Sequence, residues 1–440
     1  MKSRVTGPLL ALSMFFLLLE IALRSAPHLL PLGVLEQYEP ALRGRIAQSL
    51  RLPTRENTRL VPRRDGGPAD RLWVYRPDAD VTWALDEPGI RKVVRMDGLG
   101  FCNPITAPGT SGPADILVLG DSFAFCTAVD SSDTWVARLG EDLDRPVYNL
   151  GLPGRGPYEY LELLRTFGLA KRPRVVVMTI YEGNDLRDAV EFASSRGGAG
   201  PFDARPCAEE GLFCEAATAF RSAPVVRDSY ALGFVPALFF RLSLLAHRSE
   251  IDFRYAVTLA DGTTLSLNSR NGDRDEVAFA RALVDGSLDL SVFEKAMADF
   301  AALSREHRFT PVLVYVPAAY TAYDAAATFE DPAIQRTMRD FSERLRSWFA
   351  RAAHREGMVY LDTTVRLAAA AAASSSSSPV YFPVNVHLTA TGHSVVADAV
   401  EELFETKVAL QTRTPGENPG RHDFEQVSVA ENATGRVLRR

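Results

Sequence analysis

The chain has 440 residues, 49 of them basic and 55 acidic, which gives a formal net charge of −6. Apolar residues make up 46% of it and charged residues 24%, so the composition excludes global disorder and allows a packed core. The acidic balance offers no electrostatic basis for binding nucleic acid, and we expect no such partner. Four cysteines exclude a disulfide scaffold, and their spacing does not indicate structural zinc.

Residues 1–24 have the pattern of an export or anchoring segment. Lys2 and Arg4 precede an apolar run from Leu9 to Leu23 that is interrupted by Glu20. Positive charges before an apolar run place the remainder of a chain outside the cytoplasm. We therefore expect a signal anchor in the inner membrane with the protein facing the periplasm. The alternatives are a cleaved signal peptide, which leaves a periplasmic or secreted protein, and a buried soluble helix.

The next part of the chain predicts an extended lead-in followed by one large domain. Residues 25–110 are rich in Pro and Arg and contain only short apolar runs. Within 111–410, five continuous apolar runs are typical of parallel strands that are covered on both faces. These runs are Ile116–Leu119, Val147–Leu150, Val175–Ile180, Val312–Val316 and Met358–Leu361.

Helical patterns lie between these runs, at Thr134–Leu143, Pro157–Gly168, Phe293–Arg308 and Ala333–Gly357. Strands that alternate with helices predict an α/β fold, here a three-layer α/β/α sandwich around a mostly parallel five-stranded sheet.

Three segments depart from this alternation. Residues 188–285 form an insertion with Gly-rich loops, an apolar patch and a predicted hairpin around Asp261-Gly262, and we expect it to cap the site. The Ala and Ser run at 368–378 predicts a low-complexity linker, and the polar tail at 411–440 predicts disorder.

The cysteines gain interest in an exported protein, because disulfides persist in oxidising compartments. Cys207 and Cys214 are placed to close a small loop, and Cys102 and Cys126 to form a second bridge. The alternative is four free thiols.

The strongest chemical signal is the tripeptide Gly120-Asp121-Ser122, which directly follows the first predicted strand. A serine at the carboxyl end of such a strand, opening into a helix, exposes its hydroxyl in the crevice where open α/β sheets bind ligands. The main-chain N–H of Ser122 then points toward a developing oxyanion. The ordinary alternative is that Ser122 caps the helix.

Three further motifs follow other predicted elements. Gly154 follows the second strand, Asn184 follows the third, and His387 lies on a loop before the last helix. Glycine allows close approach of the backbone, an asparagine amide can donate to an oxyanion, and histidine can act as a general base. Each of these residues also has a structural alternative as a turn glycine, a loop cap or a packed histidine. His393 is expected to be structural and is the second choice of base.

In this order and on these elements, the four motifs resemble the SGNH (GDSL-type) hydrolase superfamily, in particular its exported or membrane-anchored bacterial members. The resemblance spans about residues 95–405 and implies that Ser122 is the nucleophile and His387 the general base. It also implies an oxyanion hole made of Ser122, Gly154 and Asn184, where Gly154 fits the family spacing better than Gly151. No metal or organic cofactor is implied.

The sequence departs from the family pattern in two places. Where the family has an Asp shortly before the catalytic histidine, this chain has Asn385. Three interpretations are open: Asn385 orients His387, Asp362 replaces the missing carboxylate, or the site is impaired. In the lead-in, the family's Asn and Arg are replaced by Asp97 and Cys102.

The sequence thus predicts an exported serine esterase that acts on acyl or O-acetyl groups of carbohydrates or lipids, with acyl transfer as a variant of the same chemistry. The alternative is a non-catalytic, membrane-tethered protein for glycan binding or assembly. A phosphoesterase is disfavoured because no phosphate-binding loop or cluster of metal ligands is evident.

Overall fold

The computed structural model describes residues 3–27, 58–62, 71–83, 92–197, 223–235, 253–268 and 274–408, together with a few single residues between these ranges. The predicted tail at 411–440, Cys207 and Cys214 lie outside the described residues.

A five-stranded parallel sheet forms the centre of the domain, and its strand order is β12-β10-β7-β5-β6. Every residue of β5 and β7 is buried, because helices cover both faces of the sheet. The five strands are those that the apolar runs predict, so the predicted α/β sandwich is confirmed. Their bounds are β5 Ile116–Leu119, β6 Val147–Asn149, β7 Val175–Tyr181, β10 Thr310–Val316 and β12 Val359–Asp362.

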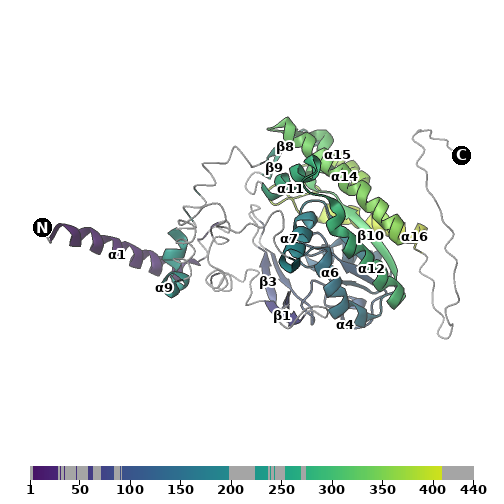
Figure 1. Cartoon of the computed structure of the whole chain (residues 1–440), viewed down its shortest axis with the longest axis horizontal. Coiled ribbons are helices and arrows are strands. Elements are labelled where there is room, and N and C mark those ends of the chain that lie inside the picture. The colour runs from purple at the N-terminus through teal and green to yellow at the C-terminus, as the bar shows by residue number, and fades with distance from the viewer. Residues whose placement is uncertain are drawn as a thin grey trace. The chain divides into compact units, whose positions relative to one another are not determined.

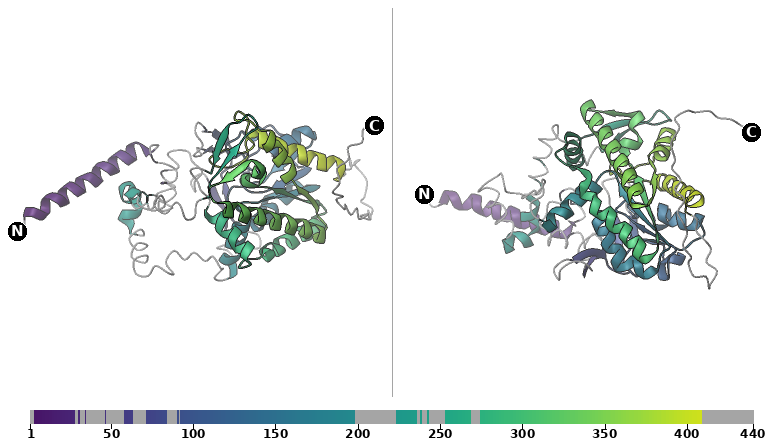
Figure 2. Two further views of the ribbon diagram at one scale, coloured as in Figure 1. Left: turned by 90° about the horizontal axis from the view of Figure 1, so that it is seen from above. Right: turned by 45° about the vertical axis from the view of Figure 1, so that its right-hand side comes forward.

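The helices, most of which are labelled in Figure 1, form two groups according to their contacts, which occur mainly within each group. One group contains α5 (Trp135–Asp142), α15 (Thr364–Ala373) and α16 (Ala390–Thr406), and α16, yellow in Figure 2, packs against α5. The other group comprises α6 (Pro157–Leu163), α7 (Asp185–Gly197), α11 (Arg274–Asp285), α12 (Glu294–His307) and α14 (Pro332–Glu356). Right-handed crossovers between parallel strands place the two groups on opposite faces of the sheet.

Local sequence explains where the longest of these helices begins and ends. The side chain of Asp331 accepts a hydrogen bond from the N–H of Ala333 at 2.8 Å, and Pro332 occupies the first position of α14. Gly357 ends the helix in the left-handed conformation, with a φ of 71°. Between these ends, Met338, Phe341 and Leu345 lie on the buried face at helical spacing.

The lead-in contains more regular structure than the sequence predicts. Strand β1 (Thr58–Pro62) pairs with β2 (Arg71–Tyr75), and β3 (Asp80–Trp83) pairs with β4 (Lys92–Arg95), both in antiparallel fashion. A short helix, α4 (Pro108–Ser111), follows. These strands are only four or five residues long, and such short runs give too weak an alternation to be recognised in a Pro- and Arg-rich background.

The N-terminal segment is a helix, α1 (Ser3–Ser25). The carboxylate of Glu20 accepts hydrogen bonds from Arg24, from Ser229 Oγ and from the main-chain N–H of Ala231, just beyond α9 (Pro224–Asp228). Over the described residues, none of the helices combines the length and the apolar character that a membrane crossing requires.

The insertion contributes a second, small sheet. Strands β8 (Tyr255–Thr258) and β9 (Thr264–Leu267) form the hairpin predicted around Asp261-Gly262, and β11 (Ala327–Phe329) pairs with β8. Gly262 has a φ of 81°, which glycine adopts without strain at such a turn.

The predicted Ala/Ser linker is partly helical. Residues 364–373 form α15, in which Leu367 and Ala371 are buried, because alanine is the strongest helix former and this run can bury one face. The serines that follow contact the hairpin of the insertion: Ser376 donates from its N–H and its hydroxyl to Asp261. The segment therefore connects the insertion to the loop that carries His387.

Candidate active site

Ser122 and His387 lie side by side at the carboxyl edge of the sheet, although 265 positions separate them. The Nε2 of His387 is 2.9 Å from the Oγ of Ser122, within hydrogen-bond distance. This is the relationship between a nucleophile and its general base.

Ser122 is held by a tight turn rather than by the start of a helix. The carboxylate of Asp121 accepts a hydrogen bond from the N–H of Phe123 at 2.8 Å, and the N–H of Phe125 donates to the carbonyl of Asp121. The expected helix is absent here because the Asx-type turn at Asp121 takes up the N–H of Phe123, and the first α-helix after β5 begins only at Trp135.

Small residues let this turn lie close to the next loop. A Cβ added to Gly120 would come within 2.7 Å of the Cβ of Ala124, and one added to Gly151 within 2.8 Å of the same atom. Ala124 thus fits between two glycines that no larger residue can replace without moving the backbone.

His387 is oriented by Asn385. The Nδ1 of His387 lies 3.1 Å from the main-chain oxygen of Asn385 and 3.3 Å from its side-chain oxygen. With its proton on Nδ1, the ring donates to Asn385 and leaves the lone pair of Nε2 for the hydroxyl of Ser122. Burial lowers the pKa of His387 to about 4, against the opposing effect of the Asn385 carbonyl.

Two structural details hold the ring in place. It stacks on Phe123, with ring centroids 5.0 Å apart, and Phe123 stacks in turn on Tyr181. The preceding residue, Val386, has a φ of 54°, which a β-branched residue rarely adopts. Strain of this kind is maintained only where the surroundings fix it, and it is often found at functional sites.

The other candidates for the triad lie elsewhere. Asp362 accepts a hydrogen bond from the N–H of Thr364 and forms an ion pair with Arg346, and it has no described contact with His387. His393 is buried, and its Nδ1 accepts a hydrogen bond from the N–H of Trp135 at 3.2 Å. Burial lowers the pKa of His393 to about 3, so this ring stays neutral and serves packing.

The geometry separates the two glycines after β6. The N–H of Gly151 donates to the side-chain oxygen of Asn149 at 2.8 Å and is therefore occupied. The N–H of Gly154 donates to no described residue, and the φ of 64° at this position suits a glycine. Gly154 is therefore the better of the two as an oxyanion donor.

Asn184 follows β7, and its side-chain amide donates to the carboxylate of Asp188 at 3.0 Å. Asp188 lies one turn further along α7, and its Cβ is so close to Gly156 that an added Cβ there would approach within 2.9 Å. Asp188 thus contacts both loops that carry the expected oxyanion donors, a role that the sequence analysis missed.

Two further carboxyl groups are buried beneath this edge. Asp185 accepts hydrogen bonds from the hydroxyl of Tyr160 at 2.7 Å and from the N–H of Tyr181 at 2.9 Å, so it braces the loop, as the sequence suggests. Burial raises the pKa of Asp121 to about 7, and the charge of Asp188 adds to this effect. Burial and the charge of Asp121 raise the pKa of Asp185 as well.

The lead-in positions these loops. The side-chain amide of Asn103 donates to the main-chain oxygen of Asn149. The side-chain amide of Asn149 donates in turn to the main-chain oxygen of Ala124. Asp97 accepts from Asn103 and from three consecutive N–H groups at residues 99–101. Asp97 thereby organises the turn at the position where the resembled family has Asn.

A disulfide joins Cys102 of the lead-in to Cys126 of the turn after Ser122. This is one of the two bridges that the sequence allows. Cys102 stands where the resembled family has Arg. The bond connects the lead-in covalently to the turn that follows Ser122.

Within the described residues, one group of acidic side chains is close enough to hold a metal ion: Asp142, Asp398 and Glu401, on the exposed surfaces of α5 and α16. It includes none of the residues described above, and exposed acidic groups of this kind are common without a metal.

No family model and no curated protein matches the sequence of the chain. Several solved structures are similar to it. The similar structures include a lipolytic protein of the G-D-S-L family from Desulfitobacterium hafniense, with a TM-score of 0.34 and 13% identity over 66% of this chain and 98% of that one. Another is an acetylxylan esterase from Geobacillus stearothermophilus, with a TM-score of 0.34 and 12% identity over 66% of this chain and 94% of that one. A third is the acetyl xylan esterase AlAXEase, with a TM-score of 0.33 and 13% identity over 65% of this chain and 98% of that one.

Proposed function

We propose that the protein is a serine ester hydrolase that acts through an acyl group on Ser122. The observation that carries this proposal is the 2.9 Å contact between Ser122 Oγ and His387 Nε2 at the ligand-binding edge of a parallel sheet. An accessible serine hydroxyl beside a neutral imidazole is the arrangement that acyl transfer needs.

In the first half of the reaction, Nε2 of His387 takes the hydroxyl proton as Oγ attacks the ester carbonyl carbon. The negative charge that develops on the carbonyl oxygen is stabilised by N–H donors, for which the main-chain N–H groups of Ser122 and Gly154 and the side-chain amide of Asn184 are the candidates. His387 then gives its proton to the departing alkoxide. In the second half, water attacks the acyl group in the same way and the carboxylic acid leaves.

Asn385 has a defined part in this scheme. It accepts a hydrogen bond from the Nδ1–H of His387 and so fixes the ring, but it brings no charge to stabilise the imidazolium. A neutral partner therefore gives a weaker base than a carboxylate would, while the low pKa keeps that base unprotonated down to mildly acidic pH.

We further propose that the substrate is an acyl or O-acetyl ester of a carbohydrate or lipid outside the cytoplasm. Export is supported by the basic residues before the apolar N-terminal run and by the disulfide between Cys102 and Cys126, since disulfides are rare in reducing compartments. Transfer of the acyl group to a sugar hydroxyl instead of water uses the same residues.

A fluorophosphonate probe and a short p-nitrophenyl ester test the activity. We expect the wild type to be labelled and active, and the Ser122→Ala variant to be neither. The absence of labelling in a folded wild type would favour the second candidate, a non-catalytic glycan-binding protein, for which the uncharged Asn385 is the supporting observation.

A further inference from the structure

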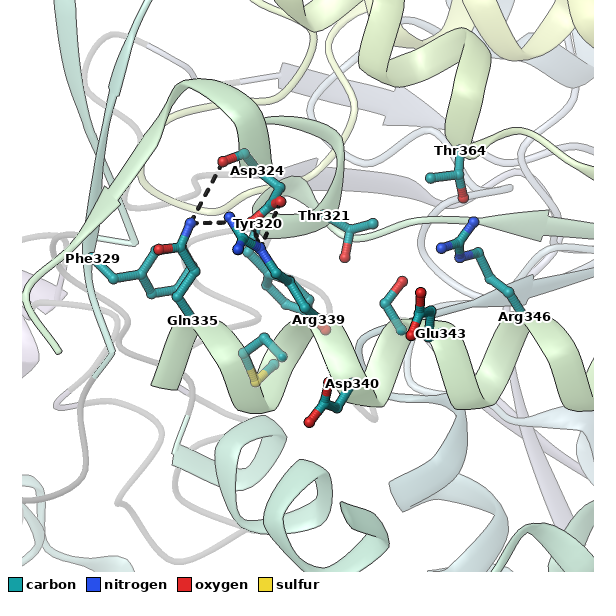
Figure 3. Close-up of a pocket in the computed structure, with 12 residues that line it drawn as sticks. Tyr320, Thr321, Asp324, Phe329, Gln335, Arg339, Asp340, Glu343, Arg346 and Thr364 are labelled. Carbon is teal, nitrogen blue, oxygen red and sulfur yellow. Dashed lines mark hydrogen bonds and ion pairs between the residues drawn. The ribbon is translucent and has the colours of Figure 1, made fainter. Parts of the chain in front are cut away.

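A polar cleft lies beyond the carboxyl ends of β10 and β12, at the edge of the sheet that also carries Ser122 (Figure 3). It has a volume of about 440 Å³ and lies between α13 (Ala319–Ala322), α14 and the start of α15. This volume is within the usual range for small-molecule sites. Its lining consists mostly of side chains with hydroxyl, carboxylate and guanidinium groups. It also includes two apolar side chains, Phe329 and Met338.

The position of the cleft relates it to the nucleophile. Tyr320 and Thr321 follow β10, Thr364 follows β12, and Ser122 follows β5, so all lie beyond the carboxyl ends of parallel strands. β10 is two strands from β5 and β12 is three, which corresponds to about 10 and 14 Å at the usual strand spacing. Tyr320 also lines a small cavity together with Tyr181 and Val386, the residue before His387.

Three buried donors in the lining have no hydrogen-bond partner among the described residues: the hydroxyls of Tyr320 and Thr364 and the Nε of Arg346. The exposed fractions of Tyr320 and Thr364 are only 4% and 8%. Burying polar groups without partners costs free energy, so a cleft that keeps three of them indicates a ligand that supplies acceptors.

The lining also contains acceptors. The hydroxyls of Thr321 and Ser342 both donate to the buried carboxyl of Glu182, so the remaining capacity of each oxygen is that of an acceptor. The carboxylate of Glu343 is exposed at the cleft's edge and adds a stronger acceptor. A ligand with both donors and acceptors around one ring, as in a sugar, matches this pattern.

The charges of the lining select against an anion. Asp324 accepts a hydrogen bond from Gln335 and forms an ion pair with Arg339, as the dashed lines in Figure 3 show. Arg346 forms an ion pair with Asp362. With both guanidinium groups paired, the carboxylates of Asp340 and Glu343 leave the cleft with negative charge. An acidic sugar would meet repulsion here, whereas a neutral sugar would not.

We propose that this cleft binds a neutral sugar unit of an acylated glycan, a few units along the chain from the ester at Ser122. The proposal rests on the proposed function and makes it more specific, because it names a neutral glycan as the substrate class and α13, α14 and α15 as the elements that recognise it.

The test compares a long and a short substrate in variants of the cleft. Thr364→Val removes one unpartnered hydroxyl at constant shape, and Glu343→Ala removes an exposed acceptor. We expect each to raise KM for mono-O-acetylated xylotetraose about tenfold, and to change kcat/KM for p-nitrophenyl acetate less than about twofold. The matched controls are Thr337→Val, whose hydroxyl donates to the carbonyl of Ala333 outside the cleft, and Glu306→Ala on α12, and both should leave both substrates unchanged.

Two further measurements complete the test. The wild type should prefer acetylated xylotetraose to acetylated tetragalacturonate. Titration of the Ser122→Ala protein with unmodified xylotetraose should show binding that Thr364→Val weakens about tenfold, a readout that does not depend on catalysis. The proposal is overturned if xylotetraose does not bind, if the anionic tetramer is preferred, or if the cleft variants affect both esters equally. A wild type that binds xylotetraose but hydrolyses neither ester would instead contradict the proposed function alone.

Discussion

Asn385 presents two oxygen atoms to one nitrogen of His387, its main-chain oxygen at 3.1 Å and its side-chain oxygen at 3.3 Å from Nδ1. The same side-chain oxygen also accepts the main-chain N–H of His387 at 3.0 Å. The ring is therefore well oriented, and its partner Asn385 brings no negative charge. This combination leads to the first prediction.

Asn385→Asp should raise kcat at pH 7 by about tenfold or more, because a carboxylate stabilises the imidazolium that forms as Ser122 attacks. The pH profile of kcat/KM should shift in a defined direction. With a His387 pKa of about 4, the wild-type base is unprotonated above that pH, so the acid limb should lie near pH 4. A neighbouring carboxylate raises the pKa of the imidazole, so the acid limb of the variant should move to higher pH. A large loss of activity would mean that Asn385 has another task.

The two histidines near the site should respond differently to removal. His387→Ala should lower kcat on a p-nitrophenyl ester by about 10³-fold or more, since it removes the base. His393→Ala should leave the rate largely intact but lower the free energy of unfolding by about 1–3 kcal/mol, because it leaves the N–H of Trp135 without its acceptor. Steady-state kinetics and urea unfolding measure the two effects, and the opposite pattern would reverse the choice of base.

Asp188 should act through Asn184. The carboxylate of Asp188 accepts a hydrogen bond from the Asn184 amide at 3.0 Å. Asp188→Ala should therefore lower kcat about tenfold with little change in KM. Asp188→Asn keeps an acceptor and should retain much of the wild-type kcat. In an Asn184→Ala background, Asp188→Ala should have no further effect on kcat. Additive losses in this double-mutant cycle would show a purely structural role. Asp299→Ala, in an exposed ion pair with Lys295 on α12, is the control.

The disulfide should contribute mainly to stability. Cys102 and Cys126 are 24 residues apart, and closing a loop of this size stabilises a folded chain by about 3 kcal/mol. Cys102→Ala and Cys126→Ala should therefore each lower the free energy of unfolding by about that amount, measured by urea denaturation without reductant. If reductant destabilises the wild type no more than the variants, the bond is not formed in solution.

Much of the fold can be predicted from the sequence because its strands are continuous apolar runs. The seven residues of β7 are all buried, and such a run between helical patterns has few other interpretations. The same reasoning places Ser122 and Asn184 at one edge, since each follows a parallel strand. The resemblance already favours Gly154 over Gly151 by its spacing, and the structure adds a physical reason, because the N–H of Gly151 is occupied by Asn149.

What the sequence could not provide are the contacts between distant segments. Asn103 binds Asn149 across 46 positions, and no local periodicity records which loop meets which. Asp188 has the spacing of an ordinary helical residue, and nothing local indicates that its Cβ lies against Gly156 in the loop after β6. The helix within the Ala/Ser run was missed because low complexity was given more weight than the helix propensity of alanine.

The close approach of Ala124 to both Gly120 and Gly151 has a practical consequence for laboratory evolution of this edge of the sheet. Saturation libraries that randomise these three codons will consist almost entirely of misfolded clones, whereas diversity at the rim of the Figure 3 cleft leaves the reacting groups where they are. Libraries aimed at new acyl acceptors or acyl donors should therefore first vary residues of α14.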